Sequence, residues 1–307
     1  MGLIKDLSPT NLAIERQKFF DSNFKYDPQF TYSRQFTTKT LTKYGLPQEK
    51  YYRLAKKYLK TNTHGPINTY SQSLLSQQDI IDQLNNLCHQ LKIEPIPAVF
   101  TSDQSSVFLL TTDNKLSVRL PITSNSTSFQ RNLDHEIQTH YLRKINNALQ
   151  PWSNETRPRT KWIRTEEGLA IYNAHHHHHQ PHFLMATILY QLAYLAQTHS
   201  FSQLFPISHQ TIKNKEQAFD YVLRVKRGLT DTSLSGGFTK DIVYWEGYLQ
   251  IKKWLADPKN NIKDLYWGKI SWQEIEELRP RANTQNLIYP TFTRNKTEKP
   301  QPPDKDS

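Results

Sequence analysis

Two histidines and three glutamates stand at spacings that suit a hydrolytic zinc site. His135, Glu136 and His140 lie within one hexapeptide, and the pair Glu166 and Glu167 follows 26 and 27 residues after His140. Zinc in hydrolases takes three nitrogen or oxygen ligands of this kind and keeps a fourth position for water. These residue types therefore predict metal-assisted hydrolysis.

The spacing of the two histidines imposes a structural condition. In the familiar zinc helix the histidines stand four residues apart, whereas His135 and His140 are five apart. In an ideal α-helix, five residues rotate the second side chain about 140° away from the first. Both rings can meet one ion only if the helix widens by a π-turn, which is rare outside functional sites. The alternative is an amphipathic helix whose histidines only cap it or line a core.

Short strands and long helices are expected to position these residues. Period-two patterns predict strands over 96–101, 106–112 and 115–120, the last two joined by a turn at Asp113-Asn114. The histidines fall in a predicted helix over 128–146 and the glutamate pair in another over 162–173. Further helices are predicted over 47–60, 76–91, 183–198, 215–227, 241–256 and 272–278. This order indicates an α+β fold, mainly helical, with a small antiparallel sheet before the H-E-x-x-x-H helix, as in zincin-like metallopeptidases.

Composition restricts the class of protein and its partners. The 307 residues carry a net charge of +11, which attracts polyanions such as nucleic acid or acidic protein tails. No zinc-finger, RNA-recognition or glycine-rich phosphate motif favours nucleic acid. No run of eighteen apolar residues and no signal core is present, and Cys88 is the only cysteine. A cytoplasmic protein without disulfides, thiolate metal clusters or membrane spans is expected.

Several blocks in a fixed order carry a resemblance to a known family. They are Gly45-Leu46-Pro47, Asp134-His135-Glu136-Ile137 with Thr139-His140, Gln150-Pro151-Trp152, Glu166-Glu167-Gly168-Leu169-Ala170, Arg227-Gly228-Leu229, Gly236-Gly237-Phe238-Thr239-Lys240-Asp241 and Gly268-Lys269-Ile270. Through them the chain resembles the tyrosine metallocarboxypeptidase family typified by the microtubule-associated tyrosine carboxypeptidases. The resemblance covers residues 25–291. A single catalytic domain is expected there, after an N-terminal segment 1–24. The charged, proline-rich end is expected to form a disordered tail over 292–307.

The resemblance also implies a reaction and the residues that perform it. Members use one Zn²⁺ to release a C-terminal aromatic residue, Tyr or Phe, from a peptide or protein, as in the detyrosination of α-tubulin. His135, His140 and Glu167 are then the metal ligands and Glu136 is the general base. Glu166 fits a supporting role better. The positive charge of the chain suits an acidic tail as the substrate, and tubulin is the partner that the resemblance suggests.

Candidates for binding the terminal carboxylate stand near the block Gly236–Asp241. Two glycines before a helix starting near Lys240 are expected to leave N–H groups free for an anion. Arg224, Arg227 and Lys240 are the nearest cations, and Tyr244 is a candidate to stabilise the oxyanion. In the alternative reading the glycines only make a turn and the arginines lie on a solvated helix face.

Two features depart from the family pattern. Gln138 stands where glycine is expected, and its larger side chain could alter the pocket. The run His175–His179 is expected to be a low-complexity loop between two helices. A second functional class also stays open, a non-catalytic basic protein that keeps the fold and binds nucleic acid or an acidic partner.

Overall fold

The computed structural model describes residues 6–61, 73–102, 107–124, 126–178 and 183–293. The chain divides into two compact units, one made of residues 1–67 and 181–249 and the other of residues 68–180 and 250–307. The single domain predicted over 25–291 spans both units. Most of the predicted disordered tail, residues 294–307, lies outside the described residues.

The second unit contains the small sheet and the helices that carry the H-E-x-x-x-H motif. Its elements are β1 (Ser73–Leu74), α5 (Gln77–Leu91), β2 (Ala98–Thr101), β3 (Phe108–Leu110), β4 (Leu116–Arg119), β5 (Thr123–Ser124), α6 (Ser126–His135), the π-helix η1 (Glu136–Tyr141), α7 (Leu142–Ala148), α8 (Arg159–His178), η3 (Ile262–Tyr266), η4 (Trp272–Glu274), α13 (Ile275–Leu278), η5 (Arg279–Arg281) and η6 (Thr291–Thr293). The mixed α+β class and the mainly helical content are as predicted.

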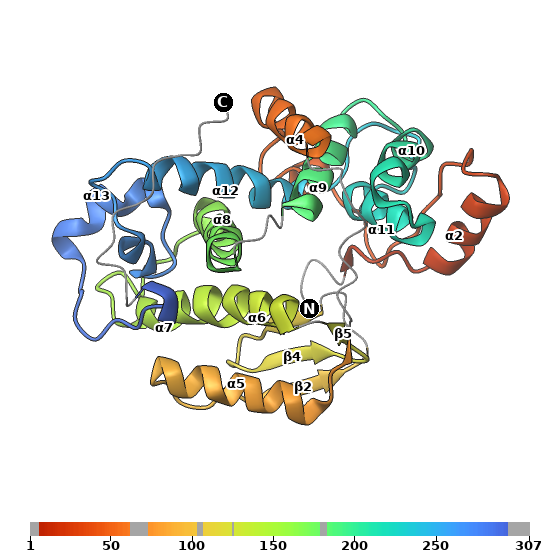
Figure 1. Cartoon of the computed structure of the whole chain (residues 1–307). Coiled ribbons are helices and arrows are strands. Elements are labelled where there is room, and N and C mark those ends of the chain that lie inside the picture. Colours follow the sequence, from red (N-terminus) through yellow and green to blue (C-terminus); the bar gives the residue numbers. More distant parts are fainter. Residues whose placement is uncertain (1–5, 62–72, 103–106, 125, 179–182, 294–307) are drawn as a thin grey trace. The chain divides into compact units, whose positions relative to one another are not determined.

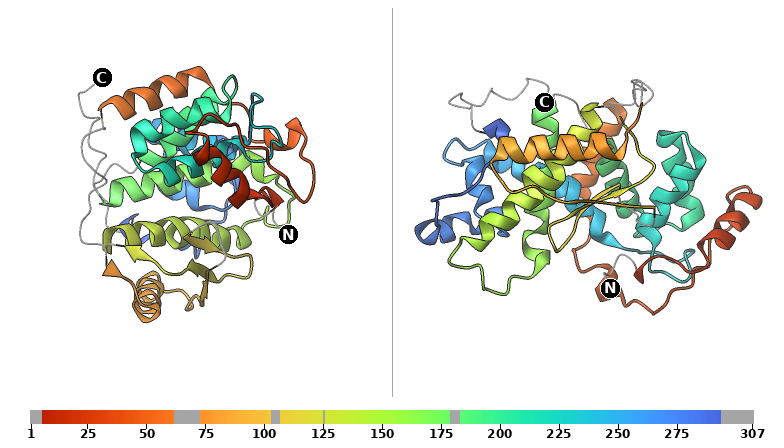
Figure 2. Two further views of the ribbon diagram at one scale, coloured as in Figure 1. Left: turned by 90° about the vertical axis from the view of Figure 1, so that its right-hand side faces the viewer. Right: turned by 90° about the horizontal axis from the view of Figure 1, so that it is seen from below.

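These elements form layers within the second unit (Figure 1). Helix α5 covers one face of the sheet and α6 covers the other, and the same sandwich is visible in the left view of Figure 2. The core between them is apolar, with Leu84, Leu116, Val118 and Phe129 almost fully buried. Helix α8 packs against α6 and η1, so the predicted glutamate helix lies directly beside the histidine helix.

The three-stranded sheet is mixed, so the prediction of an antiparallel sheet was wrong in part. Strand order is β2-β4-β3; β3 and β4 form the predicted antiparallel hairpin, while β2 pairs with β4 in parallel. The hairpin turn follows its sequence signal, because Asn114 adopts the left-handed conformation (φ 61°) that asparagine tolerates. Since β4 occupies the centre, β3 is left as an edge strand.

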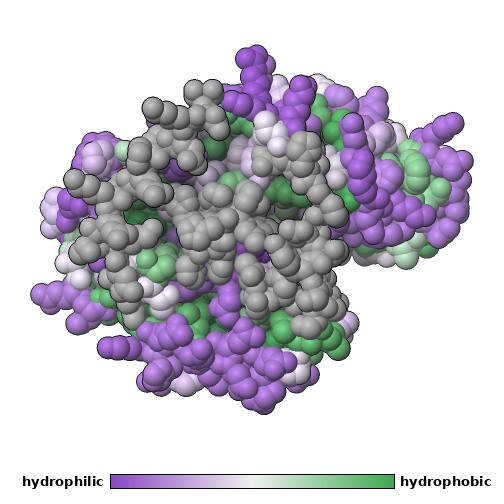
Figure 3. All heavy atoms as spheres, in the orientation of Figure 1, coloured by the Kyte–Doolittle hydropathy of each residue, from purple (hydrophilic) through white to green (hydrophobic). Residues whose placement is uncertain are grey.

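Helix α5 illustrates how local sequence specifies this unit. Ser76 and Asp79 form the predicted capping box, with the Ser76 hydroxyl accepting from the Asp79 N–H at 3.1 Å. The inward stripe includes Ile80 and Cys88, both buried, which confirms Cys88 as a core residue. The outward positions are polar, and Figure 3 shows hydrophilic side chains along the lower edge of the molecule, where α5 lies.

The first unit is helical and has an aromatic core. It comprises α2 (Leu12–Asp21), α3 (Thr38–Leu41), α4 (Glu49–Thr61), α9 (Leu184–Leu195), α10 (Phe201–Ile212), α11 (Lys215–Lys226), η2 (Thr239–Asp241) and the beginning of α12 (Ile242–Leu255), which ends in the second unit. Phe19 on α2 packs its ring at 5.2 Å from Phe201, 4.9 Å from Phe205 and 5.4 Å from Phe219. No helix in the described part of the chain combines the length and apolar character that crossing a bilayer requires.

Candidate functional site

The helix that carries the two histidines widens where the spacing requires it. Residues Glu136–Tyr141 form a π-helix between α6 and α7, and the N–H of Leu142 bonds to the carbonyl of Ile137, five residues back. The predicted π-turn is therefore confirmed. It brings the rings of His135 and His140 onto one side of the helix, with centroids 4.7 Å apart.

Buried polar groups stabilise the widened turn. The Thr139 hydroxyl donates to the carbonyl of Asp134 at 3.0 Å, five residues back. Asn173 on α8 donates its amide to that hydroxyl at 2.9 Å and to the Tyr266 hydroxyl at 2.8 Å. Tyr266 in turn donates to the carbonyl of Gln138 at 3.0 Å. A π-turn interrupts the regular helical hydrogen bonds, which costs stability. These contacts from α8 and η3 offset that loss.

The donor atoms of His135, His140 and Glu167 converge. Glu167 Oε2 lies 3.4 Å from His135 Nε2 and 3.5 Å from His140 Nε2. Tetrahedral zinc with bonds of about 2.0–2.1 Å holds its ligand atoms roughly 3.3–3.4 Å from one another. The carboxylate oxygen has this separation from both imidazole nitrogens, and ligand atoms of the two histidines lie within 4.8 Å of each other, so the residues present fit the metal.

Glu136 lies beside this set and is anchored to the sheet. Its Oε1 is 4.0 Å from His135 Nε2, and donor atoms of His135, Glu136 and His140 all lie within 4.8 Å of one another. Its Oε2 accepts the N–H of Leu110 on β3 at 3.0 Å. The carboxylate therefore stands next to the imidazoles and next to the edge strand at once.

Glu166 contacts the opposite side of His140. Its Oε1 lies 3.2 Å from His140 Nδ1, so that nitrogen is occupied and Nε2 faces Glu167. Burial alone would lower the pKa of His140, but the carboxylates of Glu166 and Glu167 outweigh it and raise that pKa to about 10. Burial opposes ionisation of Glu166 as well, yet Lys269 and His140 hold its pKa well below the ordinary range.

Exposure differs across the cluster and shows which side is open. The side chains of His135 and Glu136 are 26% and 13% exposed, whereas Glu167 and Glu166 are 5% and 2% exposed. Solvent therefore reaches the cluster at His135, His140 and Glu136, while the two glutamates of α8 lie on its closed side.

Gln138 does not join the cluster through any described contact. Its amide nitrogen donates to the Asp134 carboxylate at 2.5 Å, and its amide oxygen accepts from the N–H and hydroxyl of Thr291 at 2.8 and 3.0 Å. The side chain that differs from the family pattern thus ties the π-helix to η6.

The predicted substrate-binding residues belong to the first unit, whereas the histidine and glutamate cluster belongs to the second. Arg224 forms a two-point ion pair with the buried carboxylate of Asp241, at 3.2 and 2.8 Å. The Arg227 guanidinium lies over the Phe238 ring at 4.9 Å, and the Lys240 ammonium is 5.8 Å from the centroid of Tyr244. Their roles in binding a substrate carboxylate stay predictions.

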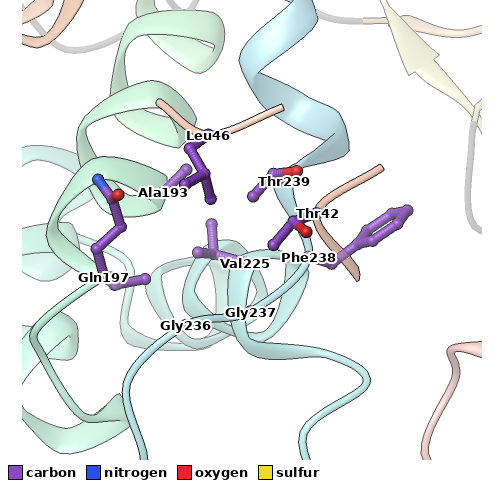
Figure 4. A pocket seen from close by; sticks show the side chains of 10 residues that line it. Thr42, Leu46, Ala193, Gln197, Val225, Gly236, Gly237, Phe238 and Thr239 are labelled. Atoms are coloured by element: carbon purple, nitrogen blue, oxygen red, sulfur yellow. The ribbon is translucent and has the colours of Figure 1, made fainter. Parts of the chain in front are cut away.

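The prediction of free N–H groups in the Gly236–Asp241 block was wrong at two positions. The N–H of Gly236 donates to Ala196 at 2.6 Å and that of Phe238 to Val225 at 2.7 Å. These bonds close the loop onto α11 and the end of α9. The glycines line a mostly apolar pocket instead, with Leu46, Ala193 and Val225 among its walls (Figure 4).

The histidine run is not a loop in its described part. Helix α8 continues to His178, because nothing in the preceding stretch Tyr172–Ala174 breaks it; His179 lies outside the described residues.

Residues distant in sequence complete the site and were missed from sequence alone. Asn173, Tyr266 and Lys269 contact the π-helix or Glu166 from α8 and from the segment after α12. Only Lys269 carried a signal, since it stands in the Gly268-Lys269-Ile270 block that resembles the family.

Comparison with known proteins shows the family of this chain. The family model described as microtubule-associated tyrosine carboxypeptidase matches residues 32–304. The chain is 30% identical over 305 residues to microtubule-associated tyrosine carboxypeptidase 1 of Rattus norvegicus, covering 94% of this chain and 64% of that protein. It is 31% identical over 300 residues to the protein of the same name from Homo sapiens, covering 93% and 63%.

The chain thus spans less than two thirds of the length of these curated relatives. The family match nevertheless covers nearly all described residues, including both histidines and the glutamate pair. The protein belongs to the microtubule-associated tyrosine carboxypeptidase family.

Proposed function

We propose that this protein is a zinc-dependent metallocarboxypeptidase with a zincin-like site, which hydrolyses the C-terminal peptide bond of a peptide or protein. The observation that supports it best is the position of Glu167 Oε2, at 3.4 and 3.5 Å from the two Nε2 atoms. This convergence exists only because a π-turn offsets the five-residue spacing. Proteins seldom keep so costly a feature without a functional reason.

His135, His140 and Glu167 would hold the metal. Zinc bound there would supply a Lewis acid that polarises the scissile carbonyl and makes water acidic near neutral pH. Glu136, on the open side of the cluster, accepts the proton of the attacking water on its carboxylate. It then delivers that proton to the amine that leaves. Glu166 keeps a proton on His140 Nδ1 and so leaves Nε2 available.

The edge strand offers a place for the peptide. Thr111 donates to Lys115 and Arg119 donates to Val107 across the hairpin, so the main-chain groups of Phe108 and Leu110 point to the other side of β3. The Leu110 N–H on that side bonds to Glu136. An extended chain held along this edge would lie beside the general base.

The substrate class follows from the relatives and from charge. The relatives are named for carboxypeptidase action on tyrosine and for association with microtubules. We therefore propose a terminal Tyr or Phe, on an acidic tail that the net charge of +11 would attract. The tail of tubulin is the first candidate.

A peptidase assay tests the proposal. Peptides ending in Glu-Tyr, Glu-Phe and Glu-Leu are incubated with zinc-loaded protein, with Glu136→Gln and with chelator, and free amino acid is measured. We expect chelator-sensitive release of Tyr or Phe that the Glu136→Gln variant, still zinc-loaded, lacks. Release that survives in this variant would remove Glu136 from the mechanism. No release from a protein with full zinc content would instead support the non-catalytic alternative.

Zinc stoichiometry must be measured in a variant that lacks the histidine run. The run His175–His179 can bind metal adventitiously, so replacing these histidines with serine belongs in every measurement of stoichiometry. One zinc per chain in that background is expected.

A further inference from the structure

The segment Leu265–Ile270 is fastened to the helix that follows the π-turn. Arg143 on α7, fully buried, donates from Nε to the carbonyl of Leu265 at 2.9 Å and from its terminal nitrogen to that of Ile270 at 2.6 Å. Both ends of the segment are thus bound by one guanidinium. Charged donors of this kind form strong, directional bonds to carbonyls.

The middle of the segment touches the same helix. Gly268 has a φ of 140°, and a Cβ on it would lie 2.5–2.9 Å from atoms of Asn147. The Asn147 amide oxygen accepts the N–H of Lys269 at 2.9 Å. Such close approach requires glycine. It places the Lys269 side chain beside Glu166 and His140.

Lys269 contacts both the predicted ligand His140 and the carboxylate that supports it. Its ammonium forms an ion pair with Glu166 Oε1, the same oxygen that lies 3.2 Å from His140 Nδ1. It also lies 3.4 Å from the main-chain carbonyl oxygen of His140, to which it donates. The Lys269 and Glu166 side chains are only 23% and 2% exposed.

We propose that Lys269 is a positioning residue of the metal site: it holds the Glu166 carboxylate against His140 Nδ1, so that His140 Nε2 faces Glu167. This role rests on the proposed zinc site. It explains why a half-buried lysine pairs with a fully buried glutamate beside His140.

The physical reason is the cost of a buried carboxylate without a counter-charge. Neutral imidazole carries its proton on one nitrogen, and an acceptor at Nδ1 selects the tautomer in which Nε2 is free to bind metal. Glu166 supplies that acceptor only while it is oriented and compensated. Without Lys269 the buried Glu166 carboxylate loses its ion pair and the contact that fixes its orientation against His140.

Zinc affinity of the full chain tests the proposal, measured by competition with a chromophoric chelator in the background without the histidine run. Lys269→Met removes the charge and the donors, and we expect about 10- to 100-fold weaker zinc binding, as for other partners of metal ligands. Lys269→Arg keeps charge and donors and is expected to recover most of the affinity. The matched control is Lys259→Met, at a lysine whose side chain is 70% exposed, and it should bind as the parent does.

A double-mutant cycle shows whether Lys269 acts through Glu166. If it does, Glu166→Gln and the double variant Glu166→Gln/Lys269→Met lose the same affinity. Losses that add, or parental affinity in Lys269→Met, would overturn the proposal. If Lys269→Met fails to fold, Lys269→Gln replaces it in the cycle, with the same expectation. A parent protein that binds no zinc contradicts the proposed function itself, which is a different outcome.

Discussion

The hydroxyl of Tyr266 donates to the main-chain carbonyl of Gln138 at 3.0 Å, across 128 residues of sequence. Gln138 lies inside the π-helix, and Asn173 donates to the same hydroxyl at 2.8 Å. One phenol therefore links the widened turn to α8. The shape of the histidine helix depends on contacts made from outside that helix.

Tyr266→Phe is expected to destabilise the π-turn while the aromatic ring still fills its place in the core. It leaves the Gln138 carbonyl and one Asn173 proton without this partner, at a cost of about 1–3 kcal/mol in the free energy of unfolding. Zinc affinity should fall in parallel, because the imidazoles lose their alignment. Urea unfolding and zinc competition measure the two effects. Unchanged zinc affinity in a destabilised variant would show that the turn does not need Tyr266.

Adjacent glutamates should differ in what they do for the metal. Glu167→Ala is expected to lose zinc on dialysis, because the oxygen shared by the two Nε2 atoms is gone. Glu166→Ala keeps all three predicted ligands and should bind zinc about 10- to 100-fold more weakly than the parent. Zinc content after dialysis against chelator separates the pair. Equal retention in both variants would be incompatible with Glu167 as the third ligand.

Two neighbouring glycines make a matched test of the loop at the Gly236–Asp241 block. A Cβ on Gly237 would lie 2.1 Å from the carbonyl oxygen of Val225, whereas nothing lies within 4 Å of one on Gly236. Both have positive φ, at 149° and 95°. Gly236→Ala is expected to cost about 1 kcal/mol from backbone strain alone. Gly237→Ala should cost about 3 kcal/mol or more, since the loop must move off α11. Urea unfolding that ranks them the other way would contradict this account.

Buried Lys226 predicts a stability difference at alkaline pH. Burial lowers the pKa of its ammonium to about 8, although Asp27 and Asp231 oppose the shift, and the group donates to the carbonyl of Leu234 at 2.6 Å. Between about pH 8 and 10.5 the folded protein has released this proton while the unfolded chain still holds it. The free energy of unfolding contributed by Lys226 therefore rises with pH over that window, by up to about 3 kcal/mol.

Lys226→Met isolates the contribution, because the tyrosines that also titrate there are common to both proteins. The difference in free energy of unfolding, parent minus variant, should be lowest near neutral pH and climb between pH 8 and 10.5. Thermal or urea unfolding at several pH values measures it. A difference that stays flat would mean that the lysine titrates normally in the folded state.

The sequence predicted the parts of this site that lie close together along the chain. The capping box at Ser76, the hairpin turn at Asn114 and the π-turn at His140 follow from short-range rules, and all three are present. Helix α10, Phe201–Ile212, was missed although Ser200 and Gln203 form a capping box, because Pro206 argues against a helix there. Pro206 lies inside this helix, where it removes one main-chain hydrogen bond without ending the element.

Long-range contacts could not be predicted in this way. Nothing in the local pattern says that Tyr266 reaches Gln138 or that Lys269 reaches Glu166, since both pairs are separated by more than a hundred residues. The parallel pairing of β2 with β4 was missed although these strands lie near each other in sequence, because strand periodicity does not name the partner strand. Hydrophobic periodicity reports which face of an element is buried, not which element covers it.

Asn173, which pins the π-turn through Thr139, lies on the same helix as Glu167. The carboxylate of the proposed ligand set and the contact that aligns its imidazoles therefore move together. If the proposed zinc is bound, we expect its exchange to be slow unless α8 separates from the π-helix.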